Sequence, residues 1–291
     1  MRKHASIILL VGCFTFSCSN NYDDSNPATI QLNEENHKSA SELSSIENEK
    51  AEKLDFVLPS PLQIAAIFQK LGLEYKKSLT HKLGISSIYS TEFQKALNFG
   101  VYSADLNYCV LNKQNQVSID YLSEVRYMSD QLGLIAIFEI EPLLESFERN
   151  IDNKDSIIYI LSKLQRNLDL FLEENETSYK AIIYFTGAWI EGMYLGSNSV
   201  DLRNKEKISN RLVEQLPLLK NLIKGLENYP RQTSEFADLV FKLKNLKSAM
   251  QVISDNSTQN ETGLTNYYMD DATLDHIINI VSDVRTHITK S

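Results

Sequence analysis

From residue 58 onward, apolar side chains recur every three or four positions along most of the chain. This spacing places them on one face of an α-helix, whereas the alternation typical of strands is nearly absent. The repeat is clearest in 154–174, 204–227, 233–255 and 271–289. We therefore predict helices over 61–71, 89–112, 115–132, 141–150, 154–174, 177–197, 204–227, 233–255 and 271–289. Because 141–150 is either separate or an extension of a neighbour, the prediction is eight or nine helices.

These helices predict an all-α fold in one domain, residues 58–291, because short connections favour antiparallel neighbours. A multi-helix bundle and a short right-handed stack of helix pairs both fit. Residues 96–111 and 179–195 are apolar nearly all round and should lie at the centre. Both carry small residues, among them Gly100 and Gly187, where two backbones could approach closely. Pro217 should kink the helix over 204–227.

The N-terminus has a different composition. Arg2 and Lys3 precede a short apolar run, and a small residue precedes Cys18, which is the layout of a bacterial lipoprotein signal. We predict a signal over 1–17, lipidation of Cys18, and a flexible polar tether over 18–57 that has too few large apolar residues to fold. Cys13 is the competing lipid acceptor, and an ordinary secretory signal is the other alternative.

The residues after Cys18 include the acidic pair Asp23 and Asp24, and in this the N-terminus resembles lipoproteins of Bacteroidota. Residues 58–65, 96–111 and 185–196 are similar to uncharacterised helical proteins of the same group. The resemblance implies a lipid anchor in the outer membrane, with the domain facing the periplasm or the outside. It implies no chemistry and no functional residues.

Charge and cysteine content narrow the classes of partner. Removing residues 1–17 leaves 27 basic residues against 38 acidic ones, a formal net charge of −11. Such a chain repels phosphate backbones, so we expect no nucleic-acid partner. With Cys18 lipidated, Cys109 is the one thiol that remains, so a disulfide framework is excluded. Cys109 lies in an apolar helical pattern, which indicates a buried, unreactive thiol.

Two acids, Asp105 and Glu191, are the sharpest candidates for chemistry, because each lies mid-helix among apolar residues, where an ionised carboxylate is costly unless paired. Asn98 and Tyr102 share a helix face with Asp105, and Trp189 is close to Glu191. Two carboxylates in a cleft with aromatic walls would suit a small polar ligand. The structural alternative is that both acids bond groups inside the core and set the helix register.

We expect no metal site and no cofactor. His276, Asp283 and His287 form a stripe on the last predicted helix, but it flanks the apolar face, which indicates a solvated surface. The sequence has no phosphate-binding loop, dinucleotide-binding motif, nucleophile elbow or zinc-protease motif. The leading function is therefore a non-enzymatic envelope module that binds another protein or a ligand. The alternative is an enzyme or a polar-ligand binder that uses Asp105 and Glu191 between the central helices.

Overall fold

The computed structural model describes residues 58–70, 74–139, 142–201, 204–229, 233–259, 265–267 and 269–290. These residues all belong to one compact unit, Lys50–Ser291. The predicted signal, the tether and Cys18 lie outside the described residues.

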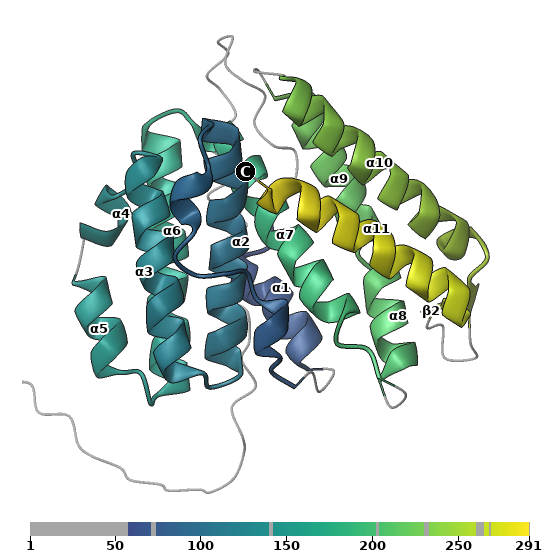
Figure 1. Cartoon of the computed structure of the whole chain (residues 1–291), viewed down its shortest axis with the longest axis horizontal. Coiled ribbons are helices and arrows are strands. Elements are labelled where there is room, and N and C mark those ends of the chain that lie inside the picture. The colour runs from purple at the N-terminus through teal and green to yellow at the C-terminus, as the bar shows by residue number, and fades with distance from the viewer. Residues whose placement is uncertain are drawn as a thin grey trace, which may run out of the picture. The chain divides into compact units, whose positions relative to one another are not determined.

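The described part of the chain is an all-α helical bundle, as the sequence predicts (Figure 1). Three single-turn 3-10 helices, η2 (Lys77–Leu79), η3 (Ser86–Ile88) and η4 (Ser178–Lys180), and one pair of two-residue antiparallel strands, β1 (Thr258–Gln259) and β2 (Thr265–Asn266), complete it. The α-helices are α1 (Pro61–Gln69), α2 (Glu92–Leu111), α3 (Asn115–Gln131), α4 (Ala136–Glu139), α5 (Leu143–Arg149), α6 (Lys154–Glu174), α7 (Ala181–Ser197), α8 (Lys205–Val213), α9 (Leu216–Glu227), α10 (Ser234–Asp255) and α11 (Asp271–Thr289).

Local signals set several helix boundaries. Ser60 and Gln63 form the reciprocal cap of α1: the Gln63 amide donates to Ser60 Oγ (3.2 Å), and the Ser60 amide donates to Gln63 Oε1 (2.6 Å). The short α4 was not predicted. The predicted helix over 204–227 is two helices, because Pro217 has no amide hydrogen and occupies the first turn of α9 instead of bending a continuous helix.

Helices α2 and α7 form the centre of the bundle and are buried over most of their length, which confirms the prediction for these two segments. A Cβ added at Gly187 would overlap the carbonyl oxygen of Leu97, and one added at Gly100 would overlap that of Tyr184. These glycines therefore let the two backbones touch. A Cβ at Gly192 would lie 2.5 Å from Ile64 Cγ2, so α1 also packs closely on α7.

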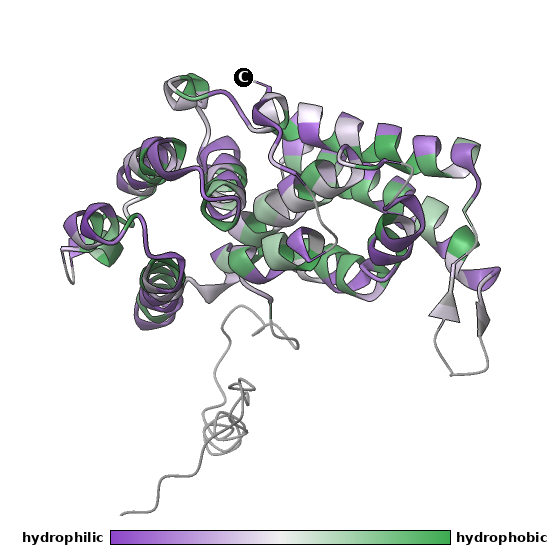
Figure 2. Ribbon diagram, turned by 90° about the horizontal axis from the view of Figure 1, so that it is seen from below, coloured by the Kyte–Doolittle hydropathy of each residue, from purple (hydrophilic) through white to green (hydrophobic). Residues whose placement is uncertain are grey.

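The remaining helices pack around this pair. Helix α3 packs against α2, while α11 packs against α7 and α10, and α10 packs against α9. Their apolar sides face inward and their polar sides face outward (Figure 2). The predicted stripe on α10 is buried along its whole length, from Phe236 to Ile253. Within the described residues, no helix combines the length and apolarity needed to cross a membrane.

Candidate functional site

The structure brings Asp105 and Glu191 together where α2 and α7 meet α11. Both carboxyl groups are completely buried. Arg285 of α11 donates two hydrogen bonds to Glu191, from Nε to Oε2 (2.9 Å) and from Nη2 to Oε1 (3.1 Å). This paired geometry is the strong form of a carboxylate–guanidinium contact, and it compensates for the burial of the Glu191 charge.

Asp105 differs from Glu191 because no cation is paired with it. Burial raises the pKa of Asp105 well above its usual value, and the charge of Glu191 raises it further. Asp105 Oδ1 is buried and has no hydrogen-bond partner in the described part. Asp105 Oδ2 accepts the backbone N–H of His81 (2.8 Å). Burial raises the pKa of Glu191 as well, and the charge and hydrogen bonds of Arg285 oppose that rise.

His81 contacts the cluster through its backbone N–H and its ring. Its Nδ1 lies 3.5 Å from Arg285 Nη2, and its Nε2 lies 2.7 Å from the Tyr89 hydroxyl. Because a guanidinium can only donate, Nδ1 must accept, and the ring hydrogen is on Nε2. Burial, followed by the charge of Arg285, lowers the pKa of His81 to about 4. The imidazole is therefore neutral at neutral pH.

His81 belongs to residues Glu74–Ser90, which we call the covering segment. It contains only η2 and η3, and side chains of α2 and α3 hold its backbone. The Tyr108 hydroxyl accepts the Lys76 N–H (2.9 Å) and donates to the Glu74 carbonyl (3.1 Å).

Further along the covering segment, Tyr121 donates to the His81 carbonyl (2.5 Å) and Tyr102 to the Lys82 carbonyl (2.9 Å). Glu124 accepts from the Gly84 amide (2.6 Å). The polar side chains of α2 and α3 on this side of the bundle therefore bind the backbone of the covering segment.

The other predicted site residues are also buried inside the helical bundle or bonded to its backbone. Asn98 Nδ2 donates to the Ile288 carbonyl (2.7 Å) near the end of α11. Trp189 is fully buried, and its Nε1 has no acceptor among the described residues. None of the five predicted residues lines either of the two hollows described below. Their arrangement matches the structural alternative, in which the acids set the packing of helices.

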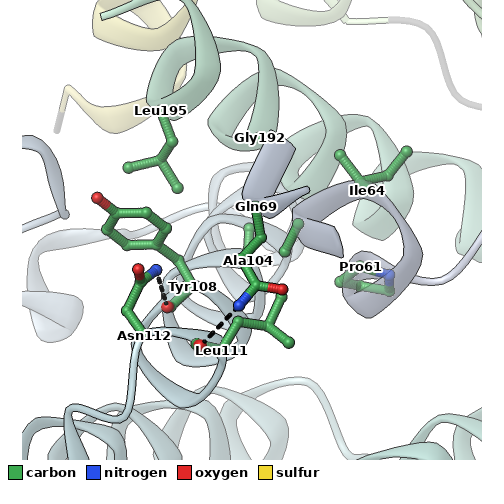
Figure 3. Close-up of a pocket in the computed structure, with 10 residues that line it drawn as sticks. Pro61, Ile64, Gln69, Ala104, Tyr108, Leu111, Asn112, Gly192 and Leu195 are labelled. Carbon is green, nitrogen blue, oxygen red and sulfur yellow. Dashed lines mark hydrogen bonds between the residues drawn. The ribbon is translucent and has the colours of Figure 1, made fainter. Parts of the chain in front are cut away.

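Two hollows occur elsewhere in the described part. One lies between α1, α2 and α7, is lined by Tyr108, Asn112 and Gln69 among others, and measures about 10 Å³ (Figure 3). This volume holds about one water molecule. The other is an open groove of about 310 Å³ between α10 and α11, lined by Phe241, Lys242, Asn245, His276, Asn279, Ile280, Asp283 and Val284.

The histidine stripe of α11 reaches this groove through His276 and Asp283. Lys242 donates to Asp283 Oδ2 (2.5 Å), so that carboxylate already has a cationic partner. No group of three or more metal-ligating side chains occurs within the described ranges.

Sequence reasoning missed Arg285 and His81. Arg285 was detectable in principle, because it lies four residues after Val281 and three before Ile288, within the apolar face of α11. A charge at such a position implies a buried partner. His81 lies in a segment without periodicity, so nothing in the sequence marked it.

Comparisons of the chain with protein-family models, with curated proteins and with solved structures found no match in any of the three. The assignment of function therefore rests on the geometry above and on the N-terminal motif.

Proposed function

We propose that this protein is a lipid-anchored module of the cell envelope, tethered through Cys18, whose helical domain binds another protein or a polar ligand without catalysing a reaction. The observation that carries the non-enzymatic part is the internal use of both acids. Glu191 is paired with Arg285, and Asp105 accepts the backbone N–H of His81. A general acid or base must reach its substrate by a hydrogen bond, and these carboxyl groups face other protein groups.

The groove between α10 and α11 is the binding surface that we propose. Its volume of about 310 Å³ is at the lower end of the range for small-ligand sites, roughly 300–1,000 Å³. Phe241 at its edge leaves 64% of its surface exposed. Asn245 and Asn279 add amide groups to its lining. An exposed ring beside amide groups suits a contact that is partly apolar and partly hydrogen-bonded.

Membrane fractionation tests the anchor. We expect the Cys18→Ser variant to leave the membrane fraction and to lose incorporation of a labelled fatty acid, because the lipid acceptor is gone. The Cys13→Ser variant is the matched control and should stay in the membrane. The opposite pattern would assign the lipid to Cys13, and membrane retention of both variants without label would refute a lipid anchor.

Photo-cross-linking in living cells of a Bacteroidota host tests the groove. A photoreactive amino acid at position 241 should give a defined adduct. The same amino acid at position 159 should not, although Tyr159 on α6 is equally exposed, at 63%. An adduct only from position 159 would place the interface on another face. Cross-links from neither position, in a sample where the protein is folded and anchored, would contradict the binding function.

A further inference from the structure

The covering segment is attached to the bundle in a different way from the helices. Of its residues, only His81, Ser86 and Tyr89 are buried. Its backbone is held by hydrogen bonds with polar side chains of α2 and α3, while Tyr89 lies in the core and Tyr75 and Leu83 pack against it. Segments with few buried apolar contacts are those that open locally, at a lower free energy than global unfolding.

His81 is the residue that closes the cluster of acids. Its backbone N–H occupies Asp105 Oδ2, and its ring is placed against Arg285. Removing the covering segment would take away both contacts at once. Asp105 and Arg285 would then each have a free hydrogen-bonding position on the side where the segment had been.

The contact between His81 and Arg285 depends on the neutral form of the imidazole. A proton on Nδ1 would turn an acceptor into a donor directed at a second donor, and would place two cations side by side. The ionisable groups around His81 come from every element packed there: Tyr89 of the covering segment, Tyr102 and Asp105 of α2, Tyr121 of α3, Glu191 of α7 and Arg285 of α11. Of the two carboxyl groups in this set, Glu191 is the one paired with Arg285, which binds both of its oxygens.

We propose that the covering segment opens as a unit while the helical core stays folded, and that protonation of His81 triggers this opening and uncovers the cluster of Asp105, Glu191 and Arg285. The pH range follows from the direction of the shift. The pKa of His81 is about 4 when the segment is closed and returns toward its ordinary 6.5 when the segment is open. The open form therefore binds the proton more tightly, and acidification through this range favours it by about tenfold per pH unit, roughly 300-fold in total.

Hydrogen exchange of backbone amides in the full chain, followed by mass spectrometry and corrected for intrinsic exchange rates, tests this proposal. At neutral pH the amides of the covering segment should show a lower opening free energy than those of α2, α7 and α10. Between about pH 6.5 and about pH 4 their opening constant should rise roughly 80-fold, which is most of the roughly 300-fold change expected in total. The His81→Gln variant, which cannot titrate there, should lack this rise. The His276→Gln variant removes an exposed histidine and should behave as the wild type.

Two results would overturn the proposal. One is a single opening free energy shared by the covering segment and the core at every pH. The other is a rise in His81→Gln as large as in the wild type. If that variant does not fold, the wild-type imidazole titration followed by NMR decides between the outcomes. A His81 midpoint near 4 that coincides with loss of protection in the segment supports the proposal, and a midpoint near 6.5, or loss of protection at another pH, refutes it.

Discussion

Replacement of Arg285 by methionine tests the account of the buried acids most directly. Methionine keeps the unbranched shape and apolar stem of arginine but removes the charge. Glu191, which is completely buried, would lose both hydrogen bonds from the guanidinium, at 2.9 and 3.1 Å, and would remain beside Asp105. Removing one partner of a buried ion pair costs about 3–5 kcal/mol.

A second route gives a similar magnitude. Without its cation, Glu191 can avoid carrying a buried charge by taking up a proton. From an unfolded pKa of about 4.3, keeping that proton at pH 7 costs about 1.36 kcal/mol per pH unit, or about 4 kcal/mol. The loss should therefore shrink by about 1.4 kcal/mol for each pH unit as the pH falls from about 7 toward 4.5.

The assay is urea unfolding of residues 50–291, which form one compact unit, followed by circular dichroism at several pH values. The control is Arg211→Met, because Arg211 pairs with Glu214 on the surface, with 49% of its side chain exposed. Loss of that surface pair should cost less than about 1 kcal/mol. A loss for Arg285→Met as small as the control, or one that does not change with pH, would refute the reasoning. The double variant with Glu191→Gln should recover part of the loss, because no charge then stays buried.

Three further predictions concern other parts of the cluster and the core. In Gly187→Ala the added methyl overlaps the carbonyl of Leu97, so we expect the free energy of unfolding, measured in urea, to fall by about 1–3 kcal/mol. A variant as stable as the wild type would show that α2 and α7 can separate at no cost. Burial raises the pKa of Cys109 to about 12, so a thiol reagent should label it only after denaturation, and rapid labelling of folded protein would contradict its position. The pKa of His81 is lowered to about 4 in the folded protein, so the unfolded chain binds a proton at this residue first as the pH falls. The free energy of unfolding of the wild type, relative to that of His81→Gln, should therefore decline by about 3 kcal/mol between pH 6.5 and 4. A difference between the two proteins that does not change with pH would refute the assignment.

Helix α7 shows clearly which features of the fold were predictable from the sequence and which were not. The apolar character of α7, interrupted by Gly187 and Gly192, was sufficient to predict a central helix with close neighbours, because helix periodicity and glycine spacing are local properties of the chain. The neighbours themselves were not predictable. Leu97 and Ile64 meet these glycines only after the helices have packed.

The candidate site shows the same limit. Sequence reasoning selected Asp105 and Glu191, because a carboxylate in an apolar helix needs a partner. It could not identify the partners, since Arg285 is 94 residues from Glu191 and His81 is 24 residues from Asp105. The predicted stripe of Asn98, Tyr102 and Asp105 is present, and these side chains bond the backbone of Ile288, Lys82 and His81, although Asn98 Oδ1 and Asp105 Oδ1 have no partner among the described residues.

The sequence by itself therefore determined the all-α class, nearly every long helix and the two central elements, because these depend on periodicities of three and four residues. It also carries the N-terminal pattern that predicts a lipoprotein signal and motivates the proposed anchor. Only the tertiary structure decided whether the acids face a cleft or the core, because that depends on long-range contacts. Arg285 and the covering segment come from opposite ends of the described chain, and their packing directs both carboxyl groups inward.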